Sequence, residues 1–404
     1  MKIYCEVCKT KLPKQNINLG DQPLCDDLIK LNSNKKNILY KIKISLCKKC
    51  LTVNQLYSVK KQTLFPKSYH YRSGLTKDVL NSMQDLSSSV SKYFNNKKKM
   101  TVLDVGCNDG SLLDFFHKRK FNTIGVEPTG AAKECKKIHK IYNNYFDKKI
   151  SKKIIKEIGT IDVITFTNVF AHINNFSELI KSLKLFISNN PKILIVIENH
   201  YLGSILNKKQ FDTFYQEHPR TYSVTSFKFI SNLLNLNIAE LNFPKRYGGN
   251  IRVFLSNQKK MSVSKFLSYE RIYFINQFNK IPKLINTWVR NKKNILLNLV
   301  KNHNILIGKA FPGRASILIN LLKLDNTVVK FVCEKKGSKK IGYKVPGTNI
   351  PIVSDRVLLK IKNKKKYKII NFAWHIKNEI KNYLKQKKIN NKMINILEET
   401  DFLK

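Results

Sequence analysis

The segment from residue 100 to residue 128 constrains the fold of this 404-residue chain more than any other. It contains an apolar run, a glycine-containing turn, an amphipathic stretch and a second apolar run, and it reads MTVLDVGCNDGSLLDFF and then FNTIGVEP. Short apolar runs predict buried strands, and apolar residues three to four positions apart predict a helix. A strand, a helix and another strand in this order predict an α/β domain with a parallel sheet.

The turn after the first strand has features of a nucleotide-binding loop. Glycine lets the backbone approach a ligand closely. The second strand ends in Glu127, about 20 positions further on, where an acidic side chain can accept both ribose hydroxyls of an adenosine. The absence of GxGxxG counts against NAD, whereas GxxxG with a leading Asp resembles motif I of class I S-adenosylmethionine (SAM) methyltransferases. The alternative is a strand–turn–helix without a ligand.

Two further apolar runs extend the predicted sheet, IDVITFTNVFAHI and PKILIVIEN. Asn168 and His172 lie near the carboxyl end of the first run, and Asn199 ends the second. Ligands of open α/β sheets bind beyond the carboxyl ends of the strands, so these polar side chains are placed for a site. A hydrogen-bonded core histidine remains the alternative for His172. We expect SAM to contact the following residues: Asp104, Gly106, Asn108, Asp109, Gly110, Glu127 and Asn168.

Four of the eight cysteines form two CxxC pairs, Cys5 with Cys8 and Cys47 with Cys50. Two such turns can supply the four thiolates of a closed, structural zinc site. The gap between the pairs is longer than in common zinc ribbons and leaves room for a hairpin. Disulfides and a redox role are the alternatives, and a reducing compartment disfavours disulfides. The other four cysteines are predicted to be packing residues.

A polar cluster follows in QFDTFYQEHPRTYSV, where Tyr215, Glu217, His218 and Tyr222 lie within eight positions. A carboxylate beside an imidazole raises its basicity, and such a histidine can act as a general base near neutral pH. A Glu-His-Pro sequence is commonplace, however, and the cluster by itself favours a structural role.

Together these features resemble the sugar C-methyltransferase family. The resemblance runs nearly end to end and is carried by the two CxxC pairs and by FPKSYHYRSGLT, LDVGCNDGSLL, GVEPTG, TNVFAHI, FYQEHPRTYSV, RYGGNIRVF and YKVPGTNIPI. It implies an α/β protein in which a class I SAM methyltransferase (Rossmann-like) domain is flanked by an N-terminal zinc-binding domain and a C-terminal Rossmann-like α/β domain. We expect the zinc domain at 1–70, a helical linker at 71–98, the methyltransferase domain at 99–256 and the C-terminal domain at 257–404.

Characterised members of the family methylate C3 of a nucleotide-linked 4-keto-deoxysugar. By this resemblance His218 is the base that removes the C3 proton and Glu217 is its partner. Tyr215, Tyr71 and His172 are expected to orient the sugar or to donate hydrogen bonds to the developing oxyanion. The expected substrate-binding residues are Tyr222, Asn199 and Arg252, the last with a surface position on a strand as its alternative.

The chain departs from the family pattern at two of these motifs. Cys107 stands in the turn where members often have Ser, and Tyr247 stands before Gly248-Gly249 where many have His. The second departure could mean a shifted substrate. We expect a monomer that uses SAM, structural zinc and a nucleotide-diphosphate 4-keto-deoxysugar.

The net charge of +48, from 75 Lys and Arg against 27 Asp and Glu, also suits a nucleic-acid partner. Few of the basic residues are arginine, and the lysines are spread along the chain, which favours a compositional bias over specific nucleic-acid binding. A methyltransferase of RNA or protein and a non-catalytic binding protein are the remaining alternatives. Because no apolar run suits a membrane span or a signal peptide, we expect a cytoplasmic protein without membrane contact.

Overall fold

The computed structural model describes residues 1–94, 100–361 and 364–403. The domain boundary expected between residues 98 and 99 therefore lies outside the described residues. Contacts along the chain define two compact units, each built from several segments. The first unit consists of Met1–Lys14, Ser45–Ile205 and Glu217–Asn276, and the second of Gln15–Ile44, Leu206–Gln216 and Gln277–Lys404.

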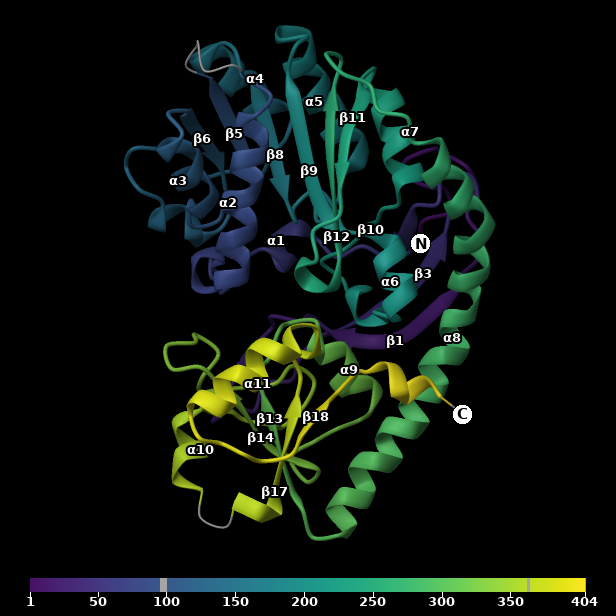
Figure 1. Ribbon diagram of the computed structural model, residues 1–404, viewed down its shortest axis with the longest axis vertical. Helices are drawn as coiled ribbons and strands as arrows, with labels where there is room; N and C mark the ends of the chain where they lie inside the picture. The colour runs from purple at the N-terminus through teal and green to yellow at the C-terminus, as the bar shows by residue number, and fades with distance from the viewer. Residues whose placement is uncertain (95–99, 362–363, 404) are drawn as a thin grey trace. The chain divides into compact units, whose positions relative to one another are not determined.

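A seven-stranded sheet forms the centre of the first unit, with the strand order β11-β12-β9-β8-β5-β6-β7 (Figure 1). Its strands are β5 Thr101–Val105, β6 Asn122–Val126, β7 Lys140–Tyr142, β8 Val163–Thr167, β9 Leu194–His200, β11 Asn237–Asn242 and β12 Asn250–Ser256. Strand β12 runs antiparallel to both of its neighbours, while β5 to β9 pair in parallel. This order, with one reversed strand inserted next to the edge, is that of class I SAM methyltransferases and confirms the predicted fold.

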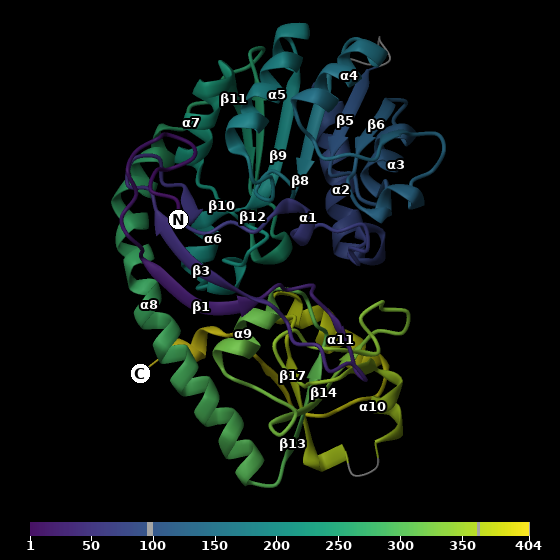
Figure 2. The same cartoon turned by 180° about the vertical axis from the view of Figure 1, so that it is seen from behind.

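Helices cover both faces of this sheet (Figure 1 and, from behind, Figure 2). They are α2 Lys77–Ser91, α3 Ser111–Lys118, α4 Lys148–Ile158, α5 Phe176–Asn189 and α7 Val224–Leu234. Successive side chains of a strand point to opposite faces, so Val102 packs in one apolar core with α2 and α3, and Leu103 packs in the other core with α4, α5 and α7. Strands that are apolar at every position are therefore buried on both faces, as parallel strands usually are.

The rest of the first unit joins the N-terminal cysteine segment to the region after β9. Strand β4 Val53–Gln55 pairs antiparallel with β10 Arg220–Thr221. A short helix, α1 Lys61–Leu64, follows β4. Helices α6 Leu202–Lys208 and α8 Ser264–Lys301 contain residues of both units.

The second unit has its own five-stranded parallel sheet, in the order β16-β14-β13-β17-β18. Its strands are β13 Ile305–Lys309, β14 Val329–Glu334, β16 Ile352–Ser354, β17 Tyr367–Asn371 and β18 Met393–Asn395, and its helices are α9 Ala315–Leu321, α10 Arg356–Lys360 and α11 Lys377–Gln386. Strand β1 Ile17–Pro23 pairs antiparallel with β3 Leu39–Leu46, and β2 Ile29–Lys30 pairs antiparallel with β15 Tyr343–Lys344. The parallel sheet confirms the predicted second Rossmann-like half.

In the described part of the chain, no helix combines the length and the apolar character that crossing a bilayer requires.

Candidate active site

The turn that follows β5 adopts backbone conformations that favour glycine. Gly106 has φ +73° and Gly110 has φ +79°, and Asn108 between them has φ +52°. A Cβ atom at Gly106 would lie 2.5 Å from the Cγ2 atom of Val169. The turn therefore requires glycine at this position for both its backbone angle and its space.

Two carboxylates at the ends of β5 and β6 have different surroundings. Asp104 is buried within the sheet and accepts a 2.7 Å hydrogen bond from Oγ1 of Thr165. Burial raises the pKa of Asp104 to about 7. Glu127 is also buried, and its two carboxylate oxygens accept hydrogen bonds from the backbone amides of Asn108 and Thr129, at 3.0 and 2.8 Å. Glu127 therefore joins the turn to the end of β6, where the ribose of a nucleoside would bind.

Asn108 and Asp109 hold a second segment against the turn. The Oδ1 atom of Asn108 accepts a hydrogen bond from the amide of Ser73 at 2.9 Å, and its Nδ2 atom donates to the carbonyl of Tyr71 at 3.2 Å. Asp109 accepts from the hydroxyl of Ser73 at 2.7 Å and from the amide of Gly74 at 2.8 Å. Two predicted cofactor residues thus position the segment that carries Tyr71.

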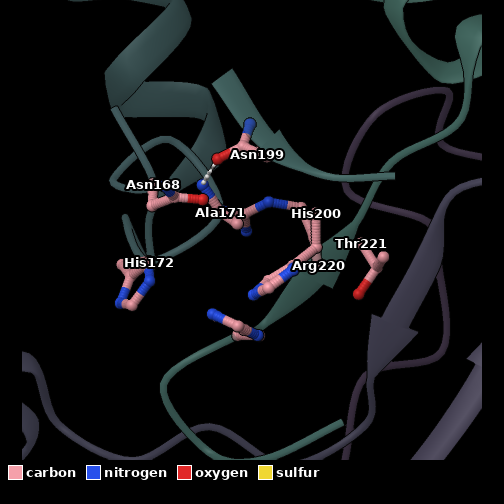
Figure 3. Close-up of a pocket in the computed structure, with 8 residues that line it drawn as sticks. Asn168, Ala171, His172, Asn199, His200, Arg220 and Thr221 are labelled. Atoms are coloured by element: carbon pink, nitrogen blue, oxygen red, sulfur yellow. Dashed lines mark hydrogen bonds between the residues drawn. The ribbon is translucent and has the colours of Figure 1, made fainter. Parts of the chain in front are cut away.

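A small cavity lies at the carboxyl ends of β8 and β9 (Figure 3). Its lining residues are Asn168, Ala171, His172, Asn199, His200, His218, Arg220 and Thr221. The Nδ2 atoms of Asn168 and Asn199 are buried and have no hydrogen-bond partner among the residues that the structure describes. Because buried polar atoms normally have partners, these amides are available to a bound ligand.

Three histidine rings converge at this cavity. The ring of His218 lies 4.7 Å from that of His172 and 5.3 Å from that of His200, measured between centroids. The carboxylate of Glu217 lies 3.9 Å from Nδ1 of His172 and accepts a 3.2 Å hydrogen bond from the hydroxyl of Tyr69. Burial, together with the neighbouring His218, holds the pKa of His172 well below its usual range. His172 is therefore neutral near neutral pH.

A pair of tyrosine hydroxyls lies beside a buried arginine. The hydroxyls of Tyr71 and Tyr247 are 3.0 Å apart, and Nη2 of Arg246 donates to the Tyr247 hydroxyl at 3.0 Å. Tyr247 also lies 5.7 Å from His200, ring to ring, which connects this pair to the histidines. The Nε and Nη1 atoms of Arg246 are buried without a hydrogen-bond partner in the described residues.

The other predicted site residues lie in several environments. Asn199 lines the cavity and accepts a 3.4 Å hydrogen bond from the amide of Ala171 (Figure 3). Tyr222 is fully buried. Arg252 is buried rather than exposed on its strand, and its guanidinium bonds Glu198 at 2.8 Å and Asp85 at 2.7 Å. Tyr215 belongs to the second compact unit, and its role stays a prediction.

The four cysteines of the CxxC pairs come together in the first unit. Their Sγ atoms all lie within 4.8 Å of one another, with Cys5 3.5 Å from Cys50 and Cys8 3.4 Å from Cys47. Cys5, Cys47 and Cys50 are buried and Cys8 is half-buried. Four thiol sulfurs at this separation fit a tetrahedral ion with Zn–S bonds of about 2.3 Å.

The sequence interpretation missed His200, Tyr69, Arg220 and Arg246. His200 directly follows Asn199 at the end of a predicted strand, so the rule used for Asn199 could have found it. Tyr69 lies in a loop, Arg220 begins the two-residue strand β10, and Arg246 begins a short 3-10 helix. These segments are too short to show a periodicity, and the position of the three side chains depends on contacts distant in the chain. Only the folded chain shows which side chains they meet.

Comparisons with known proteins agree with this geometry. Family models match along the chain: a zinc binding domain at residues 5–65, a methyltransferase domain at 77–241 and a C-methyltransferase C-terminal domain at 245–396. The C-methyltransferase NovU of Streptomyces niveus is 22% identical over 366 residues, which cover 87% of this chain and 85% of that protein. The chain belongs to the three-domain C-methyltransferase family. It is a SAM-dependent C-methyltransferase, and the resemblance inferred from the motifs is confirmed.

Solved structures share less with the chain. A SAM-dependent methyltransferase from Archaeoglobus fulgidus is 17% identical, and the match covers 44% of this chain and 93% of that one with a TM-score of 0.33. The magnesium protoporphyrin IX methyltransferase of Synechocystis, solved with S-adenosylhomocysteine, is 11% identical, with coverage of 44% and 84% and a TM-score of 0.35. The fold assignment rests on the strand order rather than on these scores.

This C-methyltransferase uses SAM and a structural zinc ion, and its own residues fit both. For SAM, the fit is the glycine turn, the buried Glu127 carboxylate and the buried Nδ2 atom of Asn168, which has no hydrogen-bond partner among the described residues. For zinc, it is the closed set of four cysteine sulfurs, which leaves no position for a substrate.

Proposed function

We propose that the enzyme methylates C3 of a nucleotide-linked 4-keto-deoxysugar. The family assignment supports carbon as the acceptor, and the relative NovU carries the name C-methyltransferase. The observation that carries the proposal is the convergence of His218, His172 and His200 on one cavity at the carboxyl ends of β8 and β9. A carbon acceptor needs a base, and histidine is the side chain best suited to that task near neutral pH.

His218 is the base in this proposal. The C4 ketone acidifies the adjacent C3–H bond, and an imidazole nitrogen of His218 accepts that proton while the bonding electrons delocalise onto the C4 oxygen as an enolate. The proton later leaves the imidazole to solvent. His172 stays neutral beside His218, so it can hold the sugar by hydrogen bonds without competing for the proton.

The hydroxyl of Tyr71 and the guanidinium of Arg246 are the donors for the oxyanion. Tyr247 lies between them and is bonded to both, so the three groups form one preorganised set. One donor of this kind contributes about 3–4 kcal/mol to transition-state stabilisation. When bound, SAM would supply an electrophilic methyl group on a sulfonium, whose transfer to C3 would leave a neutral thioether. Glu127 and the amide of Asn168 would hold SAM at the carboxyl ends of β6 and β8.

The test follows the C3 proton separately from the methyl group. Zinc-loaded enzyme is incubated in deuterated water with SAM and a panel of nucleoside-diphosphate 4-keto-6-deoxyhexoses, and C3–H exchange and methylation are followed by NMR and mass spectrometry. We expect His218→Ala to slow both by about 10²–10⁴-fold, the usual contribution of a general base, with SAM affinity retained. His117→Ala, which replaces an exposed histidine on α3, is the matched control.

Exchange that survives in His218→Ala would remove His218 as the base. Failure on every 4-keto sugar combined with methylation of RNA or of a protein would overturn the substrate assignment. Methyl transfer without prior exchange of the C3 proton would show that the enolate is methylated before its proton exchanges with solvent. The activity of His218→Ala would then decide whether His218 is the base.

A further inference from the structure

Arg220 lies two positions after His218 and is completely buried. All three of its guanidinium nitrogens have partners. Nε donates to the hydroxyl of Tyr222 at 2.8 Å, Nη1 donates to the carboxylate of Glu6 at 2.6 Å, and Nη2 donates to the carbonyl of Ile173. A buried arginine with every nitrogen bonded has a single orientation, because its planar fork matches a fixed set of acceptors.

Glu6 connects Arg220 to the zinc site. It lies between Cys5 and Cys8 in the first CxxC turn, and its carboxylate also bonds Lys2 at 2.9 Å. When both cysteines bind the ion, the backbone between them is fixed, and so is the carboxylate that extends from it. Residues just outside a metal site transmit its geometry in this way.

Both CxxC turns have further contacts to the segment after His218. Asn54 pairs with Arg220 in the short β4–β10 ladder and donates to the Sγ atom of Cys5, in the first turn, at 3.7 Å. The hydroxyl of Ser226 donates to the carbonyl of Cys50 at 3.2 Å. The first CxxC turn therefore meets residues 219–226 through Glu6 and Asn54, and the second meets them through the carbonyl of Cys50.

The other side of Arg220 meets the loop of His172. Nη2 bonds the carbonyl of Ile173 and Nη1 bonds that of Asn174 at 3.2 Å, and these two residues directly follow His172. Arg220 itself lines the cavity with His172 and His218 (Figure 3). One guanidinium thus joins the zinc turn to the backbone beside both histidines.

We propose that Arg220 is a positioning residue, through which Glu6 and the zinc-bound turn hold His218 and His172 in their reactive arrangement. The zinc domain then serves the chemistry of the neighbouring domain as well as its own fold. This inference rests on the proposed function, because it takes His218 as the base. Arg220 would set the distance and orientation of His218 relative to the C3 proton, and proton transfer is sensitive to both.

The primary variant is Glu6→Ala, because Glu6 is partly exposed and its loss leaves no large cavity. We expect zinc content and SAM affinity to be retained, and kcat to fall by about 10–100-fold, the usual cost of removing a residue adjacent to a metal site, while KM changes little. Lys2→Ala is the matched control, since it removes the other cation bonded to Glu6 and leaves the Arg220 bond in place. We expect Lys2→Ala to behave as wild type.

A second readout needs no substrate. Hydrogen–deuterium exchange of the zinc-loaded Glu6→Ala protein should show faster exchange in peptides covering 172–174 and 217–226, with α4 unchanged as the internal reference. Removal of zinc from the wild-type protein should give the same pattern. Unchanged protection of both peptides in Glu6→Ala, or equal loss of kcat in Glu6→Ala and Lys2→Ala, would overturn the inference.

The two proposals fail in different ways. If the wild-type enzyme acts on no 4-keto sugar, the proposed function fails. The amide-exchange pattern of Glu6→Ala still tests whether the zinc turn holds the histidine segments through Arg220. If the wild-type enzyme is active and Glu6→Ala matches it in kcat and in amide exchange, only the inference about Arg220 fails.

Discussion

Asp104 is a buried carboxyl at the start of the glycine turn, and its contact with SAM stays a prediction. Its Oδ1 atom accepts a hydrogen bond from Thr165 on the neighbouring strand. Burial raises the pKa of Asp104 from 3.8 to about 7, against the opposing effect of that hydrogen bond. Ionising this group therefore costs free energy in the folded state.

The sign of this shift gives a pH-dependent prediction. A carboxyl with a raised folded-state pKa binds its proton more tightly in the folded protein, so its contribution to stability falls as the pH rises from about 4 to about 7 and is constant above that. Asp104→Asn removes the ionisation but keeps an oxygen for Thr165. We expect the variant to be more stable than wild type at pH 8, by an amount on the order of 1–4 kcal/mol, and the difference to be smaller near pH 4.5.

Urea unfolding at both pH values measures this difference. Because wild type and variant share the remaining charges, the comparison between them isolates Asp104. A variant that is less stable than wild type at pH 8 would show that the carboxylate is held ionised by interactions that the fold requires.

Tyr247 is one of the residues at which this chain departs from its family's pattern, and it lies next to Arg246. The sequence shows only that a tyrosine replaces a histidine before Gly248-Gly249. The structure shows that the Tyr247 hydroxyl bonds Tyr71 and Arg246, so the substitution supplies a phenol where the family has an imidazole. The panel of 4-keto sugars tests whether this substitution shifts the substrate.

At the level of elements, the turn between β5 and α3 depends on Gly106. The prediction is that Gly106→Ala distorts the turn, because the added Cβ would lie 2.5 and 2.8 Å from the two Cγ atoms of Val169. A left-handed φ by itself costs a non-glycine residue about 1–2 kcal/mol, and the clash adds to that. We expect SAM affinity, measured by calorimetry, to fall at least ~10-fold, the equivalent of about 1.4 kcal/mol.

Gly20→Ala is the control for the backbone angle. Gly20 has φ +75°, close to that of Gly106, but a Cβ there would meet nothing within 4 Å. It should lose some stability and keep SAM affinity. Equal SAM affinity in Gly106→Ala and wild type would show that Val169 moves aside at little cost.

Strand β12 shows an element that periodicity does not predict. Its residues are all buried and could belong to a parallel strand, yet it runs antiparallel between β9 and β11. This reversal pairs Arg252 with Glu198 across the ladder, and the two side chains bond at 2.8 Å. A buried ion pair of this kind is costly to break, because one charge would remain without a partner.

At the scale of the whole molecule, the net charge of +48 creates a positive field around the enzyme. Such a field raises the encounter rate with anionic ligands and is screened by salt. We expect kcat/KM for a nucleotide-diphosphate sugar to fall several-fold between about 10 and 150 mM salt, where the Debye length shortens from about 30 to about 8 Å. The value of kcat should stay constant.

The KM for SAM, which carries no net negative charge, is the internal control and should not rise with salt. Binding to an arbitrary RNA should weaken steeply over the same range, as expected for contacts that only neutralise phosphates. RNA affinity that depends on sequence at 150 mM salt would contradict the interpretation of the charge as a general field.

The class of fold and the chemistry of the two ligand sites could be predicted from local sequence patterns. Local patterns suffice because a buried strand, a glycine turn, a helix and a second strand form from residues that are neighbours in the chain. A zinc site needs only that two CxxC turns come together, so their spacing in the sequence indicates it. The family resemblance extended the same information to the catalytic residues. The roles of those residues, unlike the fold, remain proposals that the experiments above address.

Which side chains share an environment could be learned only from the folded chain. Asn108 and Asp109 bind the Tyr71 segment, Arg252 meets Glu198 and Asp85, and Arg220 meets Glu6, which is more than two hundred positions away. These pairings depend on the order of strands in the sheet and on contacts between distant segments. Local periodicity does not predict these pairings. Because the groups are buried, each pairing contributes to the stability of the fold, since a buried polar group without a partner costs free energy.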